Sequence, residues 1–223
     1  MRSILASLAI VVLLSGCSTS RTPTLTTAQD LIADSVETLA QFNRHKTLKD
    51  YHQYLDGAAG VVILPAVLKV SWVGGAETGD GVLLARKPGG GWTDPTFHTM
   101  VAASIGMQVG IQDTAIILIL RSEKAVNSIL KHQGKFGADM GATAVFSGVG
   151  GEASTTSNLG ADIVAFAAPN IGAYVGGSLE GAVLVTRRDY NELVYGAGAT
   201  PDAILAGRLK TAIARPLQKA LGP

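Results

Sequence analysis

Hydrophobic residues recur at helical spacing near the start of the chain and in strand-like runs after residue 60. The first pattern predicts a helix that begins at Thr26 or Thr27, since either side chain can cap it and Asp30 then lies in the first turn. A second, short helix is expected over residues 48–55. The helically spaced positions of the first helix are Leu31, Ile32, Val36, Leu39 and Phe42.

Beyond residue 60, short apolar runs alternate with turn-like segments, which is typical of an antiparallel sheet. Residues 61–64 form a β-rich run that Pro65 is expected to end. Residues 116–120 are apolar throughout, as in a strand buried on both faces. Hairpins are predicted from residues 70–75 and 81–86 with a turn at 77–80, from 104–112 and 114–121 around Asp113, and from 173–177 and 182–186; residues 138–149 and 159–168 are two further expected strands.

Two more helices are expected later in the chain. Ser122 can cap a helix that reaches about His132, and Thr200 can cap another with Pro201 at its first position. Together these elements predict a single α+β domain. It consists of a twisted antiparallel sheet that curls toward a barrel or sandwich and is packed by N- and C-terminal helices.

The glycine-rich stretch WVGGAETGDGVLLAR, residues 72–86, could be a phosphate-binding loop or part of a hairpin. A P-loop needs Gly-Lys followed by Ser or Thr, but the one Gly-Lys pair, at residues 134–135, is followed by Phe136. A dinucleotide-binding loop leads into a helix, whereas a strand-like run follows Gly81. A similar outline recurs in YVGGSLEGAVLVTR, residues 174–187. The glycines are therefore interpreted as turn, bulge and close-packing positions of a repeated hairpin.

The first residues have the pattern of a processed signal. Arg2 precedes an apolar segment of about a dozen residues, too short to cross a membrane as a helix. Leu-Ser-Gly-Cys at residues 14–17 resembles the bacterial lipoprotein signal, in which the cysteine is acylated; an ordinary signal peptide with a chance cysteine is the alternative. Since Ser18 follows Cys17, the resemblance implies the outer membrane, on its periplasmic side or at the cell surface. The expected organisation is a signal peptide over 1–16, a lipidated tether over 17–27, a domain over 28–198 and a helical tail over 199–223.

The composition favours a globular core and argues against a nucleic-acid partner. Hydrophobic residues make up 47% of the chain and charged residues 16%. Loss of residues 1–16 removes Arg2 and no acidic residue, so the 18 basic side chains become 17 and equal the 17 acidic ones. Nucleic-acid binding usually requires a basic surface, so no such partner is expected.

Patterns typical of catalysis or metal binding are missing from the sequence. The four histidines are scattered; His45 and His52 could share a helix face, but ordinary surface histidines are the simpler interpretation. The segment around Ser178 misses the Gly-x-Ser-x-Gly elbow of serine hydrolases by one residue. Glu152 and Glu180 are interpreted as solvated turn residues. No catalytic residue, metal or cofactor is therefore predicted.

The basic tail is one candidate for contact with anionic lipid. No acidic residue follows Asp202. On a helical wheel the basic residues of 207–223 fall opposite an apolar stripe, although Lys210 lies on the apolar side and Pro216 would kink the helix. Such a helix can lie on an anionic membrane or pack on its own domain with a solvated basic face, and packing is the simpler interpretation. The candidate lipid-binding residues of the tail are Arg208, Arg215 and Lys219.

A second, weaker basic segment covers residues 43–52. Its candidate lipid-binding residues are Arg44, Lys46 and Lys49. The alternative is a solvated loop between two helices.

Six glycine-containing or acidic blocks follow one another along the chain. They are GVVILP (60–65), GDGVLL (79–84), GWTDP (91–95), GMQVG (106–110), GAD (137–139) and SLEGA (178–182). As an ordered set they resemble the SYLF domain family over about residues 28–196. The resemblance implies a non-enzymatic, membrane-associated module. Eukaryotic relatives bind phosphoinositides through a basic, amphipathic N-terminal part, and fungal relatives also bind actin.

These observations predict a lipid-anchored envelope protein whose domain binds anionic phospholipid or another apolar lipid ligand, without enzymatic activity. The expected partners are membrane phospholipid and the acyl anchor on Cys17. The alternative is a structural or protein-interaction module of the cell envelope that has no lipid ligand of its own.

Overall fold

The computed structural model describes residues 23–46, 48–71, 74–105, 110–132, 145–148, 162–171 and 182–223. The predicted signal peptide, Cys17, Glu152, Ser178, Glu180 and the expected strand over residues 173–177 lie outside the described residues.

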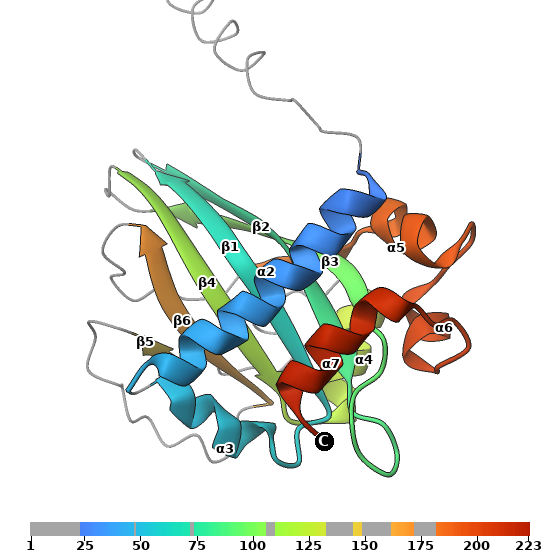
Figure 1. Cartoon of the computed structure of the whole chain (residues 1–223). Coiled ribbons are helices and arrows are strands. Elements are labelled where there is room, and N and C mark those ends of the chain that lie inside the picture. The colour runs from blue at the N-terminus through green and yellow to red at the C-terminus, as the bar shows by residue number, and fades with distance from the viewer. Residues whose placement is uncertain are drawn as a thin grey trace, which may run out of the picture.

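Seven strands form one open, twisted sheet at the centre of the described structure (Figure 1). They are β1 (Gly60–Ser71), β2 (Gly74–Ala85), β3 (Thr96–Ile105), β4 (Gly110–Leu120), β5 (Val145–Gly148), β6 (Ile163–Ile171) and β7 (Val183–Thr186). Their order in the sheet is β5-β6-β4-β1-β2-β3-β7, and every neighbouring pair is antiparallel except β5 and β6. Within the described residues β5 and β7 are the two edges, so the sheet is open there.

Helices from both ends of the chain pack against the sheet, which confirms the predicted α+β class. The longest of them, α2, runs diagonally across one face with α7 beside it (Figure 1). The helical elements are α2 (Leu25–Arg44), the 3-10 helix η1 (Leu48–Tyr51), α3 (His52–Leu55), α4 (Glu123–His132), α5 (Arg188–Tyr195), α6 (Pro201–Leu205), the 3-10 helix η2 (Ala212–Ala214) and α7 (Arg215–Leu221).

The helix α2 begins slightly earlier than its sequence pattern predicts. Its cap is Thr24, not Thr26 or Thr27. The Thr24 Oγ1 accepts a hydrogen bond from Thr27 N–H at 3.2 Å, and Thr24 N–H donates to Thr27 Oγ1 at 2.8 Å. This reciprocal capping box satisfies two donors at the start of the helix. Along the helix one stripe is buried, with Ala28, Ile32, Ser35, Leu39 and Phe42 at helical spacing.

Two hydrophobic layers, one on each face of the sheet, explain the apolar runs in the central strands. Successive side chains of a strand point to opposite faces. Ile63 of β1 and Ile117 of β4 pack in the layer that contains α2, whereas Leu64 and Leu118 pack in the layer that contains α4. All four side chains are fully buried. The prediction that residues 116–120 form a strand buried on both faces is confirmed.

The predicted boundaries of the first two hairpins are wrong. Residues 77–80, expected as a turn, lie within β2. Asp113, also expected at a turn, lies within β4 and pairs with Leu68. Pro65 does not end its strand, because a bulge between Ile63 and Leu68 shifts the register and lets β1 continue.

The glycines of β2 permit close strand packing rather than a turn. A Cβ on Gly79 would lie 2.3 Å from the Ala66 carbonyl oxygen, and one on Gly81 would lie 2.4 Å from the Ile63 carbonyl oxygen. Both oxygens belong to the part of β1 around the bulge. Local propensity therefore favours a turn at Gly-Asp-Gly, but the strand pairing keeps this segment extended at a place where only glycine fits.

Later elements agree better with their sequence signals. Ser122 caps α4, since its Oγ accepts from Ala125 N–H at 3.1 Å, and Thr200 caps α6 in the same way. The strands β5 and β6 overlap the runs expected at 138–149 and 159–168. The strand β7 pairs with β3, so this late apolar run lies beside a strand that is much earlier in the sequence.

The C-terminal tail is not one amphipathic helix. It divides into α6, η2 and α7, and Pro216 lies in the first turn of α7, where proline is tolerated, instead of kinking a longer helix. Leu217 and Leu221 are buried in the layer that contains α2. The tail therefore packs on its own domain, as the simpler interpretation holds, and its basic side chains remain exposed.

Candidate functional site

A groove of about 760 Å³ lies between the C-terminal tail and the loop that follows β2. This size is in the range of ligand-binding clefts. We call it the basic groove, because four of its described lining side chains are cationic and one is anionic. Its charged side chains are Arg86, Lys87, Asp94, Lys210 and Arg215.

The loop wall of the groove is a tight turn after β2. Lys87 N–H donates to Gly91 O at 2.9 Å, and Gly90 N–H donates to Lys87 O at 3.1 Å. Gly89, Gly90 and Gly91 all have positive φ, between 72° and 100°, which other residues rarely adopt. The triple glycine after Pro88 therefore allows a turn compact enough to hold Lys87 at the edge of the groove.

Trp92 anchors this loop in the core. Its side chain is buried, and the Arg86 guanidinium carbon lies 4.0 Å from its ring centroid, a cation–π distance. The same guanidinium donates to the carbonyl oxygens of Leu55 at 2.7 Å and Pro223 at 2.6 Å. Arg86 is thus a structural cation that joins three parts of the chain beside the groove.

Asp94 fixes the tail wall. Its Oδ2 accepts from the Thr211 backbone N–H at 2.6 Å, and its Oδ1 accepts from the Gln218 side-chain amide at 2.8 Å. The Gln218 amide also donates to Trp92 O at 3.2 Å. Both carboxylate oxygens therefore accept from neutral donors, and no ion pair within the described residues involves Asp94.

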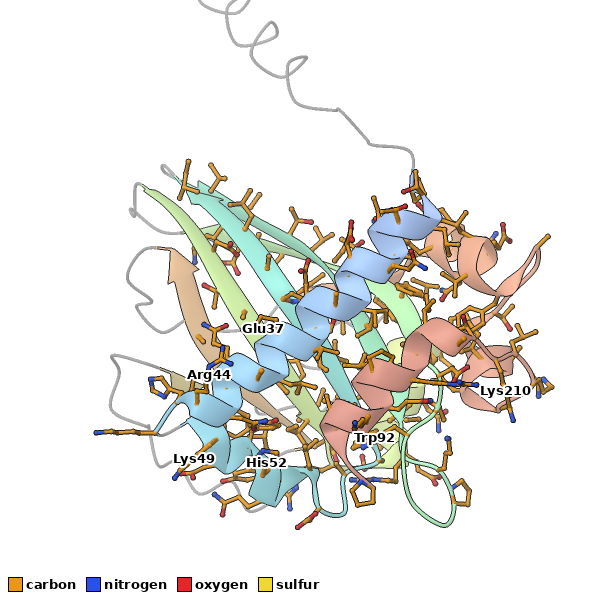
Figure 2. All side chains as sticks on the ribbon, viewed as in Figure 1. Glu37, Arg44, Lys49, His52, Trp92 and Lys210 are labelled. Atoms are coloured by element: carbon orange, nitrogen blue, oxygen red, sulfur yellow. The ribbon has the colours of Figure 1, made fainter. Side chains whose placement is uncertain are left out.

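Three cations of the basic groove remain available to a ligand. Lys87, Lys210 and Arg215 are exposed, and none forms an ion pair within the described part of the chain. In Figure 2, Trp92 and Lys210 mark the loop and the tail that form the two walls. Clustered like charges create a local positive potential that favours an anionic group. Arg215 can bind a carboxylate or phosphate through two parallel hydrogen bonds, while the lysines act as point charges.

The basic residues near the end of α2 lie apart from this groove (Figure 2). Arg44 donates to Glu37 at 2.7 Å, and both side chains are exposed. Lys46 is exposed, and Lys49 borders a smaller pocket. That pocket is lined by Asn43, Lys49, Asp50, His52 and Gln53.

Polar groups at this smaller pocket bond to one another. The Tyr51 hydroxyl donates to Asn43 Oδ1 at 3.0 Å, and the His52 ring contacts the same oxygen. Burial raises the pKa of Tyr51 to about 12, so its hydroxyl stays a neutral donor near pH 7. Carboxylates lie beside the cations of this region, and its polar side chains form hydrogen bonds with one another. The region is therefore less suited to bind an anion than the basic groove.

A third charged site joins β2, β3 and β7, and we call it the Arg187 cluster. Arg187 donates to Asp80 at 2.9 Å and to Asp189 at 2.7 Å, and it lies 4.2 Å from the Tyr190 ring centroid. Thr99 Oγ1 also donates to Asp80. The hydrogen bond from Arg187 holds the pKa of Asp189 below its ordinary value. Two carboxylates neutralise the cation of this cluster, so the cluster is less suited to an anionic ligand than the basic groove.

The structure brings one of the six predicted lipid-binding residues into the basic groove. That residue is Arg215. Arg208 and Lys219 are exposed on the tail but do not line the groove. The other three lie at the end of α2, as described above. Contact of these six residues with lipid stays a prediction.

Sequence reasoning missed Arg86, Lys87 and Lys210. An available signal was the Arg-Lys pair directly before Pro-Gly-Gly-Gly, combined with a tail free of acidic residues. Lys210 falls on the apolar side of a continuous helical wheel. Because the tail is broken between α6 and η2, that wheel does not apply, and Lys210 lies at the groove.

Metal binding and membrane crossing are two further possibilities for the described residues. No group of three or more His, Cys, Asp or Glu side chains there could hold a metal ion. None of the helices in the described ranges combines the length and apolar character needed to cross a membrane.

The sequence matches the family described as "Ysc84: Las17-binding protein actin regulator" over residues 101–222, more than half of the chain. The chain belongs to this family. The resemblance to the SYLF domain is thereby confirmed. The matched region runs from β3 to α7 and contains the tail wall of the basic groove, with Lys210 and Arg215.

Similar proteins come from yeast and vertebrates. Protein YSC84 of Saccharomyces cerevisiae is 33% identical over 158 residues, which cover 70% of this chain and 34% of the yeast protein. LAS seventeen-binding protein 3 of the same species is 31% identical over 158 residues, with the same coverage. SH3 domain-containing YSC84-like protein 1 of Xenopus laevis is 29% identical over 146 residues, 62% of this chain and 41% of the frog protein. This chain thus spans about a third of the length of its yeast relatives.

Proposed function

We propose that this chain is a non-enzymatic binding module, held at an envelope membrane through Cys17, whose basic groove binds an acidic segment of a protein partner. The observation that carries this proposal is the set of unpaired cations, Lys87, Lys210 and Arg215, in a groove whose walls are already held in place. The family description names Las17 binding, and one relative is named for binding that protein. Both names favour a protein partner over a lipid ligand.

The chemistry of the groove suits a segment rich in carboxylates. Exposed ion pairs contribute about 0.2–1 kcal/mol each, so three of them give specificity and a faster encounter more than high affinity. Binding should therefore weaken as the salt concentration rises, since the Debye length is about 10 Å at 0.1 M and about 3 Å at 1 M.

Photo-crosslinking in living cells tests the groove directly. A photoreactive residue replaces Ala212, an exposed lining residue, in the full-length protein. We expect adducts with a protein whose crosslinked peptide is acidic. The adducts should be lost when Lys87, Lys210 and Arg215 are all changed to Glu.

A matched control reverses three charges outside the groove. Arg208, Lys219 and Lys131 are exposed and do not line it, so changing all three to Glu should leave the adducts intact. Equal loss in both triple variants would show that net charge, and not the groove, controls binding.

Anionic phospholipid is the competing outcome. A soluble Cys17→Ala form that floats with phosphatidylglycerol vesicles, and stops floating only in the groove variant, would assign the groove to lipid. The anchor is tested separately, by metabolic labelling with palmitate in the native protein and in Cys17→Ala. Label in the native protein alone is the expected result.

A further inference from the structure

One end of the sheet extends beyond the helices that cover it (Figure 1), and four large apolar side chains are exposed there. Leu68 and Val70 of β1, Val101 of β3 and Ile111 of β4 are 44%, 51%, 47% and 66% exposed. We call these four residues the sheet-end patch. Large apolar side chains that gather on a surface commonly mark a contact with a protein or a membrane.

Strand register makes the patch continuous. Val70 pairs with Ile111, Leu68 pairs with Thr78, and Thr78 pairs with Val101. The patch therefore lies on β4, β1 and β3, with Thr78 of β2 between Leu68 and Val101. The half-buried Asp113 of β4 shares this face, because it pairs with Leu68. Since Val67 packs in the layer of α4, the alternation along β1 places the patch on the face that carries α2.

On the opposite face of these strand ends lies an ion pair whose side chains are less exposed than those of the patch. Lys69 Nζ lies 2.8 Å from Glu77 Oε1, and the two side chains are 21% and 20% exposed. An antiparallel sheet with one solvated face normally turns its polar side chains to water. Here the charges are the more protected groups and the aliphatic side chains meet solvent. This reversal indicates that another apolar surface covers the patch.

The start of the described chain indicates which surface that is. In Figure 1 the N-terminal end of α2, beside α5, and the tips of β1, β2 and β4 both lie toward the upper side of the view, the helix at its right and the strand tips at its left. Cys17 precedes Thr24, the cap of α2, by seven residues. A fully extended chain of that length spans at most about 25 Å. An acyl group on Cys17 would therefore keep this end of the domain close to the bilayer.

We propose that the sheet-end patch lies on the membrane surface and orients the domain so that the basic groove points away from the bilayer. This inference rests on the proposed anchor at Cys17. The acyl group holds the protein at the membrane, and the aliphatic side chains determine which end contacts the boundary between headgroups and acyl chains. Lys210 and Trp92 lie toward the other end of the molecule (Figure 2), so the groove stays accessible to a protein partner.

The mature lipoprotein allows this orientation to be measured with single labels. Its one cysteine is the proposed acylation site, so in the acylated protein an introduced cysteine would be the only free thiol. Val70→Cys and Ile111→Cys are labelled with the fluorophore NBD in the full lipidated chain. The protein is reconstituted in vesicles of phosphatidylethanolamine and phosphatidylglycerol. Lys87→Cys and Lys210→Cys serve as matched controls at the groove, since both side chains are also exposed.

We expect vesicles to shift the emission at positions 70 and 111 to the blue, and spin-labelled lipid to quench it. Positions 87 and 210 should show neither effect. Protein that floats with the vesicles but is not quenched at 70 and 111 would overturn the orientation and leave the anchor intact. Protein that does not float would overturn the anchor itself.

A blue-shifted emission at position 70 before vesicles are added would also overturn the proposal. It would show that a second copy or another segment of the chain covers the patch. Dilution distinguishes these two, because only a contact between copies is lost at low concentration.

Discussion

The basic groove and the Arg187 cluster both place an arginine over an aromatic ring directly after a strand, yet their charges are arranged differently. Arg86 follows β2 and lies 4.0 Å from the Trp92 ring, whereas Arg187 follows β7 and lies 4.2 Å from the Tyr190 ring. Two carboxylates neutralise the cation of the Arg187 cluster. In the groove, Asp94 accepts from an amide and a backbone N–H instead. Among the described residues, no carboxylate pairs with Lys87, Lys210 or Arg215.

The difference separates a structural site from the proposed binding site. A charge that is half-buried needs a partner in the folded protein, since water no longer solvates it fully. An exposed charge keeps its hydration and costs little to leave unpaired. Charges that serve stability are therefore paired inside the fold, and charges that serve binding are left for the ligand.

The largest expected effect concerns β3, one of the three strands that the Arg187 cluster joins. His98 of β3, next to Thr99 of the cluster, is fully buried, and its Nε2 lies 2.8 Å from Thr96 Oγ1. Burial lowers the pKa of His98 to about 4, against 6.5 in the unfolded chain. Between these values the unfolded chain binds a proton that the folded chain does not. Stability should therefore be complete above pH 6.5 and fall by about 3 kcal/mol as the pH drops to 4.

Denaturant unfolding at a series of pH values measures this loss. His98→Gln should remove the slope between pH 6.5 and 4, because glutamine does not titrate. A slope that is unchanged in His98→Gln would assign the acid sensitivity to other groups.

Loss of the central cation should break the Arg187 cluster. Arg187→Met leaves Asp80 and Asp189 without their charged donor and should lower the free energy of unfolding by about 2 kcal/mol. The comparison variant Arg187→Lys keeps the charge and should lose less. Thermal and denaturant unfolding test both variants, and an unchanged midpoint in Arg187→Met would contradict a stabilising role.

Asp94→Ala should have a smaller effect on stability and a local effect on the groove. The backbone N–H of Thr211 and the Gln218 amide lose their acceptor, which costs about 1–2 kcal/mol. Amide hydrogen exchange should become faster at Thr211. Asp94→Asn retains one acceptor oxygen and should lie between Asp94→Ala and the native protein; protection of Thr211 that survives in Asp94→Ala would show that other contacts hold the tail.

The unpaired cations of the groove should matter least for stability. Lys87→Ala, Lys210→Ala and Arg215→Ala are each expected to change the free energy of unfolding by less than about 0.5 kcal/mol. The same variants should weaken crosslinking to the partner. If Arg215→Ala destabilises the protein as much as Arg187→Met does, the distinction between the two sites is wrong.

Sequence patterns predicted the class of the fold and several local signals well. The apolar run at 116–120 and the caps at Ser122 and Thr200 all have the expected structure. The two caps depend on residues a few positions away in the chain. The run at 116–120 is apolar throughout, so its burial is strongly favoured. Strand boundaries were predicted less well. Residues 77–80 have turn propensity, yet all four pair with β3, and Glu77 and Thr78 also pair with β1.

The candidate site was predicted only in part. Arg215 was among the expected binding residues, but Lys87 and Lys210 were not. The two lysines are 123 positions apart in the chain, so no local pattern connects them. Their proximity depends on Asp94, which ties the loop to the tail through Thr211.

The amino-acid sequence alone determined which segments are apolar enough to be buried, where several helices begin, and that the charges nearly balance. Membership of the family also follows from sequence. Tertiary structure decided that the glycines of β2 stay extended against the bulge of β1, that the tail is broken rather than continuous, and which cations are paired. Burial and capping follow from a residue and its near neighbours, whereas charge pairing depends on segments that only the folded sheet brings together.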